Sequence, residues 1–290
     1  MERTRDSGRL PRRPYRDGIE LSVIGLGGML LWGMEQDHVD RTVAGFIERG
    51  GCYFDVAPTY GDSEERLGPA LQPYREGVFL ACKTTQRDAA GSQEELETSL
   101  RRLRTDHVDL YQFHGVSSMD DVEQILAAGG AGETFLRAKE QGKARYLGFS
   151  THSEEAAVAL MDRFPCDSVL MPVNFVCFKQ GGFGPMLLEA AAERNVVRLS
   201  MKSIALDRRG RGDRQDYPKC WYRPLADPET ARLALRFTLS QDVSATVPPG
   251  DEELFGMLVD LACDFEPITA EEQDRLMAHS EGVEPVFHTA

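Results

Sequence analysis

The sequence lacks several patterns that would place a protein in a familiar class. Its six cysteines are scattered, with no Cys-x-x-Cys pair and no histidine at the spacing of a metal ligand. Neither a metal site nor a disulfide framework is therefore indicated. We expect a protein without a bound metal, in the reducing environment of the cytoplasm.

Long apolar runs are absent too. Residues 1–16 hold six arginines, but Asp17 and Glu20 interrupt the stretch in which a signal peptide would have its apolar segment. The uncharged stretch 21–34 contains a glycine-rich turn and is too short to cross a bilayer. We therefore expect neither a signal peptide nor a membrane protein.

Positive charge is scarce. The chain has 33 Lys and Arg residues against 47 Asp and Glu residues, a formal net charge of −14. Such an excess argues against nucleic acid or an anionic membrane as the main partner. An enzyme of small molecules fits this balance better, and the sequence makes no prediction about the oligomeric state.

The chain also has no linker and no low-complexity tract. Hydrophobic residues make up 41% of it and charged residues 28%, mixed along its length. A length of 290 residues suits one α/β barrel, which commonly has about 250 residues or more. We expect a single barrel domain over residues 1–290, with residues 1–8 disordered.

Short runs rich in β-branched and aromatic residues alternate with stretches whose apolar residues recur at helical spacing. The predicted strands are 20–27, 52–57, 77–83, 107–114, 144–150, 168–175, 196–203 and 243–249. Predicted helices include 37–50, 92–104, 153–164, 186–195 and 227–240. This alternation indicates a (β/α)8 TIM barrel, with a short N-terminal hairpin across its floor and an extra C-terminal helix over 269–280.

Four polar residues stand at or just past the ends of three consecutive predicted strands: Asp55, Tyr60, Lys83 and His114. Reactive groups of such barrels lie at the carboxyl ends of the strands. Because side chains alternate along a strand, an inward direction for Asp55, Lys83 and His114 turns their neighbours toward the helices. Those neighbours are Phe54, Cys82 and Phe113.

These four residue types together can protonate a carbonyl oxygen. A tyrosine, whose ordinary pKa is about 10, becomes a stronger acid beside the Lys83 ammonium. Asp55 would keep that buried ammonium charged, and His114 would hydrogen-bond the carbonyl. The four residues predict general-acid chemistry with a hydride donor that a cofactor must supply. The alternative is a buried ion pair with a tyrosine and a histidine nearby by chance.

At these residues the chain resembles the aldo-keto reductase superfamily. The matching pieces are IGLGGM at 24–29, FDVAPTYGDSEERLG at 54–68, ACKTT around Lys83, LYQFHG at 110–115, GKARYLGFSTHS at 142–153, PVN at 172–174 and RFTLSQDVSATVPPG at 236–250. The resemblance covers nearly the whole barrel. It implies a nicotinamide cofactor across the barrel mouth, Tyr60 as proton donor, Lys83 and Asp55 as its tuning pair, and His114 as the orienting group.

The resemblance also implies where the cofactor binds. The matching positions are Gly28, Met29, Ser150, Thr151, Met201, Lys202 and Gly250. Ser150 matches the serine that holds the nicotinamide amide, whereas Thr151 replaces an asparagine. Leu170 or Met171 stands where the family often has glutamine. Met201 replaces a stacking tyrosine, and its thioether can still pack on a ring.

After the last strand the chain departs from relatives that use NADPH. Where they carry Lys or Arg for the 2′-phosphate, this sequence has Asp251, Glu252 and Glu253. Carboxylates repel a phosphate, so NADH and NADPH stay equally open as cofactors. Acidic residues in the first turn of a helix also complement the helix dipole, which is an alternative explanation.

Trp32 and Trp221 are candidates for the substrate pocket, and His152 is close enough in sequence to Ser150 to approach the cofactor. The long connection 203–227 carries several basic residues: Arg208, Arg209, Arg211, Arg214, Lys219 and Arg223. It would fold over the cofactor pyrophosphate, meet an anionic substrate, or simply lie in water.

The sequence thus predicts NAD(P)H-dependent reduction of an aldehyde, ketone or sugar-like carbonyl, or the reverse alcohol oxidation. Its partner would be a small-molecule carbonyl or alcohol. Two alternatives stay open: a cofactor-binding regulatory subunit with vestigial activity, and NAD-assisted sugar elimination or epimerisation. A Schiff-base aldolase using Lys83 is less compatible, because Asp55 should keep that amine protonated.

Overall fold

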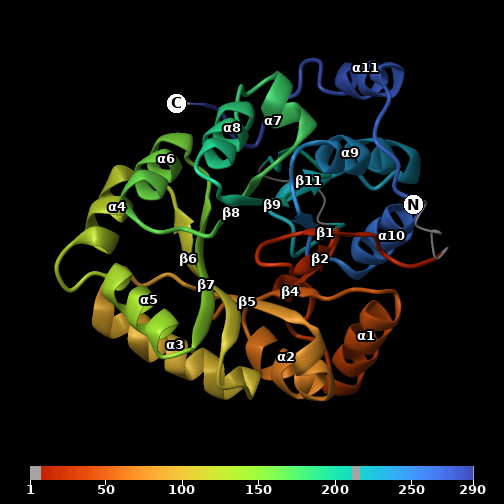
Figure 1. Ribbon diagram of the computed structural model, residues 1–290. Coiled ribbons are helices and arrows are strands. Elements are labelled where there is room, and N and C mark those ends of the chain that lie inside the picture. The colour runs from red at the N-terminus through yellow and green to blue at the C-terminus, as the bar shows by residue number, and fades with distance from the viewer. Residues whose placement is uncertain (1–7, 211–215, 290) are drawn as a thin grey trace.

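The computed structural model describes residues 8–210 and 216–289 (Figure 1). Within them eight parallel strands form one sheet in the order β12-β9-β8-β7-β6-β5-β4-β3. A parallel bridge between Ile24 and Thr246 joins its two ends. The predicted (β/α)8 barrel is therefore confirmed.

The barrel strands are β3 Gly25–Gly27, β4 Tyr53–Asp55, β5 Phe79–Thr84, β6 Val108–Val116, β7 Ala144–Thr151, β8 Ser168–Pro172, β9 Val197–Met201 and β12 Ala245–Val247. Two antiparallel pairs lie outside this sheet. They are β1 Arg12–Pro14 with β2 Glu20–Ser22, and β10 Ala205–Arg208 with β11 Tyr222–Pro224. The first pair is the predicted N-terminal hairpin.

The helices surround the sheet (Figure 1). They are α1 Gln36–Glu48, α2 Ser63–Leu71, α3 Ala89–Leu103, α4 Met119–Leu126, α5 Ala131–Glu140, α6 Glu154–Arg163, α7 Phe175–Lys179, α8 Pro185–Glu193, α9 Pro228–Ser240, α10 Glu252–Cys263 and α11 Ala270–Ala278, with the short 3-10 helices η1 Gly28–Leu30 and η2 Gln72–Gly77. The expected extra C-terminal helix is α11, which Thr269 starts with a capping box.

Two predicted strands differ from the structure for local reasons. The first one, 20–27, is divided into β2, which pairs with β1, and β3, which belongs to the barrel. Between them the Ser22 hydroxyl donates a hydrogen bond to the Ile24 carbonyl at 2.7 Å. The predicted strand 168–175 ends at Pro172. Asn174 accepts hydrogen bonds from Val176 N and Cys177 N and thereby starts α7.

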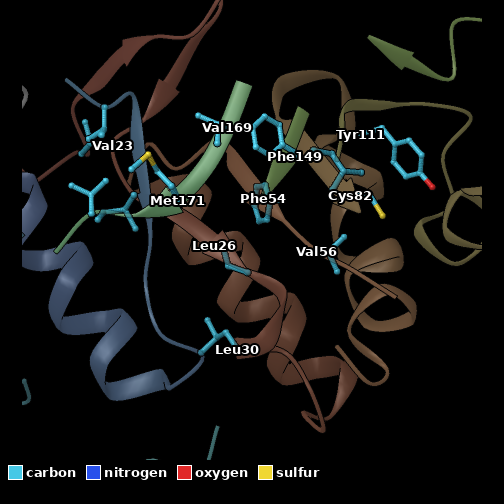
Figure 2. Packing of buried hydrophobic residues seen from close by; sticks show 14 of the residues in the cluster. Val23, Leu26, Leu30, Phe54, Val56, Cys82, Tyr111, Phe149, Val169 and Met171 are labelled. Carbon is cyan, nitrogen blue, oxygen red and sulfur yellow. The ribbon is translucent and has the colours of Figure 1, made fainter. Parts of the chain in front are cut away.

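The larger hydrophobic core lies between the sheet and the helices (Figure 2). Phe54 makes an edge contact with Phe46 of α1, and Phe113 stacks on Phe135 of α5 at a centroid distance of 3.6 Å. Cys82 is fully buried in the same cluster. The predicted outward direction of Phe54, Cys82 and Phe113 is therefore confirmed.

A second core fills the barrel from below. Tyr15 and Leu21 of the hairpin region pack with inward-facing residues such as Tyr53 and Phe79. The Tyr15 hydroxyl donates to Ser168 Oγ at 3.1 Å. This plug closes the floor, so the open end is the one where the carboxyl ends of the strands meet.

Three remaining predictions from the sequence concern disorder at the N-terminus, the state of the cysteines and the absence of a membrane-spanning helix. Of the segment predicted to be disordered, residues 1–7 lie outside the described residues, whereas the Gly8 carbonyl accepts a hydrogen bond from Arg49 Nε at 3.0 Å. All six cysteines are free thiols. No helix in 8–210 or 216–289 is long and apolar enough to cross a membrane.

Candidate active site

A cavity of about 280 Å³ opens at the carboxyl end of the barrel. All four residues predicted to act together line it. Its walls comprise Gly27, Met29, Asp55, Tyr60, Lys83, His114, Ser150, His152, Leu170, Met201, Lys202, Lys219, Cys220, Trp221, Tyr222, Val247, Pro248, Pro249 and Gly250. Residues separated by up to 223 positions in sequence, from Gly27 to Gly250, thus share one site.

Asp55 and Lys83 form a buried ion pair at the ends of β4 and β5. The Lys83 ammonium donates to Asp55 Oδ1 and, at 3.3 Å, to the Val56 carbonyl. Burial lowers the pKa of Lys83, but the charge and hydrogen bond of Asp55, together with the nearby Tyr60, outweigh it and hold the pKa above its ordinary value. Lys83 is therefore a cation at neutral pH, as predicted.

The second oxygen of Asp55 has two neutral donors. Gln112 Nε2 donates to Oδ2 at 3.0 Å, and the Tyr53 hydroxyl donates at 3.2 Å. The sequence patterns do not predict these contacts, although strand alternation places Gln112 on the same face as His114. Both carboxyl oxygens of Asp55 therefore have hydrogen-bond donors.

Tyr60 lies in the loop after β4, beside the ion pair. The Lys83 ammonium is 5.1 Å from the centroid of its ring. Burial raises the pKa of the Tyr60 phenol by more than the Lys83 charge lowers it. The net direction is opposite to our expectation from the sequence, because the protein removes water from the phenol as well as placing a cation near it. Tyr60 therefore carries its proton at neutral pH.

His114 faces Tyr60 across the cavity. The two rings meet edge to face with centroids 5.6 Å apart. Burial lowers the pKa of His114 to about 3, and the charges of Lys83, Arg87 and Lys202 act in the same direction. A neutral imidazole has one N–H to donate, so His114 can hydrogen-bond a carbonyl oxygen without competing as an acid.

Ser150 and Thr151 occupy different environments. Ser150 lines the cavity, and its Oγ accepts from Gly115 N at 2.8 Å, which leaves its own proton to donate. Thr151 is fully buried, and its hydroxyl donates to the Val116 carbonyl at 2.7 Å and accepts from Ser153 N at 3.0 Å. Thr151 does not line the cavity, so its observed contacts are with the protein itself.

Lys202 brings a second ammonium to the cavity. Its Nζ lies 3.1 Å from His152 Nε2, and its charge lies over the rings of Trp221 and Phe287. Among the described residues no carboxylate contacts it. Burial lowers the pKa of Lys202 to about 7 and, together with the charge of Lys202, lowers that of His152 to about 3.

The first loop and the last loop approach each other closely. A Cβ atom on Gly28 would come within 2.8 Å of Val56 Cγ2, and one on Gly250 within 2.7 Å of Met29 Cβ. Both positions therefore require glycine. Gly28 itself is packed behind the cavity rather than in its wall.

The two tryptophans differ in position. Trp221 lines the cavity, together with Lys219, Cys220 and Tyr222 of the long connection, whose residues 211–215 lie outside the described part. Trp32 is 48% exposed and packs against Gly61 instead. Trp32, which the sequence predicts to lie in the substrate pocket, thus does not line the cavity in this structure.

Two of the three acidic residues after β12, Asp251 and Glu252, have partners within the protein. Asp251 caps α10 by accepting from the backbone N–H groups of Glu253 and Leu254, both at 3.1 Å. Glu252 Oε1 lies 2.5 Å from His38 Nε2. Asp251 is therefore the N-cap of α10, and Glu252 and Glu253 lie in its first turn, where the alternative explanation by the helix dipole places them.

Comparison with known proteins agrees with this geometry. The model of the Aldo/keto reductase family matches residues 23–218. The chain belongs to the aldo/keto reductase family. Aldo/keto reductases generally reduce carbonyl groups with NAD(P)H, and this one is accordingly an NAD(P)-dependent oxidoreductase.

Two curated relatives are similar over different lengths. Aldo-keto reductase YhdN of Bacillus subtilis is 32% identical over 176 residues, which span 54% of this chain and 51% of that protein. The chain thus spans about half the length of this relative. The oxidoreductase YqkF of the same organism is 26% identical over 90% of this chain and 94% of its own length.

Solved structures show the same fold. The holo form of aldo-keto reductase AKR11C1 from Bacillus halodurans has a TM-score of 0.71 and 23% identity, covering 97% of this chain and 98% of that one. This aldo/keto reductase therefore has the family's barrel over nearly its whole length.

Proposed function

We propose that this protein reduces an aldehyde, ketone or sugar-like carbonyl with a nicotinamide cofactor, or oxidises the corresponding alcohol, with Tyr60 as the proton donor. One observation carries the proposal. The buried Asp55–Lys83 pair adjoins a protonated phenol and a neutral imidazole in one cavity. These groups suit a carbonyl oxygen that gains negative charge and then a proton.

The lining of the cavity supports binding of the nicotinamide end of such a cofactor. Ser150 has a hydroxyl proton to donate, and the Lys202 ammonium has no carboxylate partner among the described residues. Met201, Leu170 and Val247 supply apolar surface on which a planar ring can lie. We assign cofactor contacts to Met29, Ser150, Met201, Lys202 and Gly250, with Gly28 shaping the loop behind them. The cofactor supplies the hydride.

The four site residues then have separate tasks. The neutral imidazole of His114 donates to the carbonyl oxygen and orients it toward Tyr60. The phenol of Tyr60 gives its proton to that oxygen as negative charge develops there. Lys83 stabilises the phenolate that remains, and Asp55 keeps Lys83 charged. In the direction of alcohol oxidation the same groups act in reverse.

For the cofactor, we propose that NADH binds at least as well as NADPH. Glu252 and Glu253 are exposed in the first turn of α10, where their charge would repel a 2′-phosphate. Asp251 is unsuitable for testing this, because its replacement would also remove the helix cap. Glu253→Arg removes one exposed carboxylate, adds a cation and leaves the cap intact.

The test is a fluorescence titration of the purified protein with NADH and with NADPH. The wild type should bind NADH with an affinity equal to or higher than that for NADPH, and Glu253→Arg should shift the ratio toward NADPH by about tenfold or less. Tighter NADPH binding by the wild type would show that the carboxylates face away from the phosphate. Failure to bind either cofactor would reject the reductase assignment itself.

A further inference from the structure

The backbone that carries His114 leaves the regular sheet. The register between β6 and β7 shifts between Phe113 and Val116. Within this irregularity Gly115 has a φ of +65°, a left-handed conformation that suits glycine. The strand ladder is therefore interrupted at His114 and Gly115.

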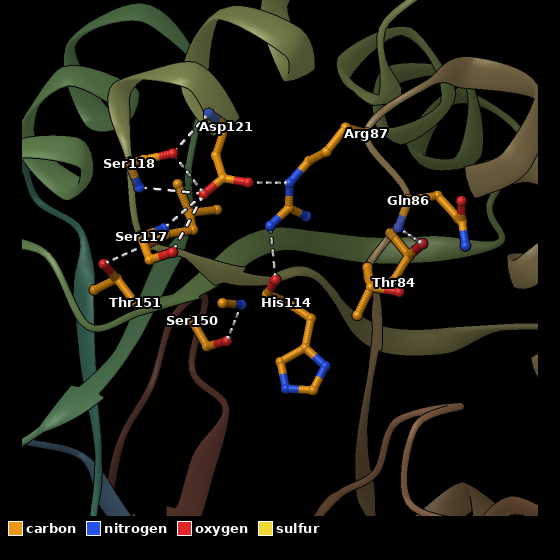
Figure 3. Close-up of polar contacts among 12 residues, drawn as sticks. Thr84, Gln86, Arg87, His114, Ser117, Ser118, Asp121, Ser150 and Thr151 are labelled. Carbon is orange, nitrogen blue, oxygen red and sulfur yellow. Dashed lines mark hydrogen bonds and ion pairs between the residues drawn. The ribbon is translucent and has the colours of Figure 1, made fainter.

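Arg87 supplies a partner for the His114 carbonyl (Figure 3). Its Nη2 donates to that oxygen at 2.8 Å, and its Nε donates to Asp121 Oδ1 at 2.8 Å. The main chain of Arg87 is fixed as well, because its carbonyl accepts from Ala131 N at 2.8 Å. The guanidinium thus links the end of β6 to the start of α4.

Asp121 extends this connection along the loop that follows His114. Its Oδ2 accepts from Ser117 N at 3.0 Å and from Ser118 N at 3.1 Å, and it forms the capping box of α4 with Ser118 (Figure 3). The capping box needs only Asp121 and Ser118. It therefore does not explain why an arginine reaches past Asp121 to His114.

Burial of this guanidinium has a cost. The Arg87 side chain is 14% exposed, and its Nη1 has no hydrogen-bond partner within the described residues. An unpaired buried N–H is unfavourable in a folded protein. A methionine could fill comparable space without that cost, but it could not hold the His114 carbonyl.

We propose that Arg87 is a positioning residue for the reaction, which holds the main chain of His114 so that the imidazole meets Tyr60 and the substrate carbonyl at the required angle. The proposal rests on the proposed function of the site. Displacement of a catalytic group by about 1 Å can lower a rate by about 10²-fold. The effect on catalysis should therefore exceed the effect on binding.

The charge of Arg87 also affects His114, because it helps to keep the imidazole neutral. The groups around the imidazole are Tyr60 and Lys83 on the side of β4 and β5, His152 after β7, and Lys202 after β9. Burial and the charges of Lys83, Arg87 and Lys202 lower the pKa of His114. Removal of Arg87 should raise that pKa.

The test compares Arg87→Met and Arg87→Lys with Arg163→Met as a matched control. Arg163 is half-exposed and also pairs with an α4 residue, Glu123, through Nη2 at 3.0 Å, without contacting His114. We expect Arg87→Met to lower kcat by about 10- to 100-fold with an unchanged Kd for the cofactor. Arg87→Lys should recover only part of the loss, because one ammonium cannot copy the two-sided guanidinium contact.

A second readout needs no turnover. The ring resonance of His114, assigned with His114→Asn, should shift in Arg87→Met and begin to titrate at a higher pH than in the wild type. Unchanged resonances, or equal losses of kcat in Arg87→Met and Arg163→Met, would overturn the proposal. Absence of turnover in the wild type would instead count against the proposed function, and the resonance comparison would still show whether Arg87 holds the main chain of His114.

Discussion

Asp55 pairs with Lys83, which in turn lies beside Tyr60. It accepts hydrogen bonds from Lys83, Gln112 and Tyr53, and together these satisfy both of its oxygens. The position of Asp55 at a strand end was predictable from spacing. The contacts of Gln112 and Tyr53, and the net rise in the pKa of Tyr60, were not, because they depend on how many groups exclude water around each atom.

Removal of Lys83 should destabilise the folded protein, because it leaves the buried carboxylate of Asp55 without its partner. Lys83→Met should lower the free energy of unfolding by about 3–5 kcal/mol, because Asp55 would be left charged in the barrel without its cation. The double variant with Asp55→Asn should recover most of this loss. Urea unfolding of the two variants and the wild type measures both effects, and additive losses would contradict the account.

The two low-pKa histidines should make stability depend on pH. His114 and His152 have pKa values of about 3 in the folded protein, below the ordinary value of about 6.5. As the pH falls below about 6.5, the unfolded chain binds these protons first, so stability decreases by up to about 1.4 kcal/mol per pH unit for each histidine. His152→Phe keeps the ring that Phe287 stacks on and should reduce the slope. An unchanged slope would show that His152 is solvated.

Helix starts explain much of the element-scale agreement between sequence and structure. Asp227 caps α9, Ser153 caps α6 and Thr269 caps α11, and each begins a predicted helix at or within one residue of its expected start. The helices α2, α4, α5, α7 and α10 are not among the helices predicted from the sequence. Length does not explain this, because α2 and α5 are as long as the predicted α8 and α6, and tertiary contacts help to decide the structure of such short helices.

Substitution of Asp251 tests whether this residue of the acidic segment after β12 acts as the N-cap of α10. Asp251→Ala should lower the free energy of unfolding by about 1 kcal/mol, because two backbone N–H groups lose their acceptor. Asp251→Asn, whose side-chain oxygen can still accept, should cost little. Thermal unfolding of both variants checks this, and equal losses would mean that charge, not capping, is what Asp251 contributes.

The whole molecule separates a stabilising end from a reactive end. The hairpin of β1 and β2 plugs the floor of the barrel, and the cavity opens at the opposite end. The alternation of strands and helices predicted this architecture well, because each barrel strand repeats the same pattern. Closure at Ile24 and Thr246, more than two hundred residues apart, depends on the whole set of strands and not on either segment alone.

This separation predicts that the floor can be weakened without loss of the site. Tyr15→Ala should create a cavity in the barrel core and lower the free energy of unfolding by about 3–5 kcal/mol. The Kd for the cofactor should stay within about twofold of the wild-type value at a temperature where the variant is folded. Urea unfolding and a cofactor titration on the same sample provide both numbers. A large change in Kd would show that the floor and the mouth are coupled.

The central claim is that Tyr60 donates the proton in a nicotinamide-dependent carbonyl reduction. The most direct measurement is the consumption of NADH or NADPH with a panel of small aldehydes by the wild type and by Tyr60→Phe, which removes only the hydroxyl. We predict turnover by the wild type and a kcat lowered by about 10²- to 10⁴-fold in Tyr60→Phe, with cofactor binding retained. Equal rates in the two proteins would contradict the role of Tyr60, and tight cofactor binding without turnover by the wild type would favour a regulatory subunit instead.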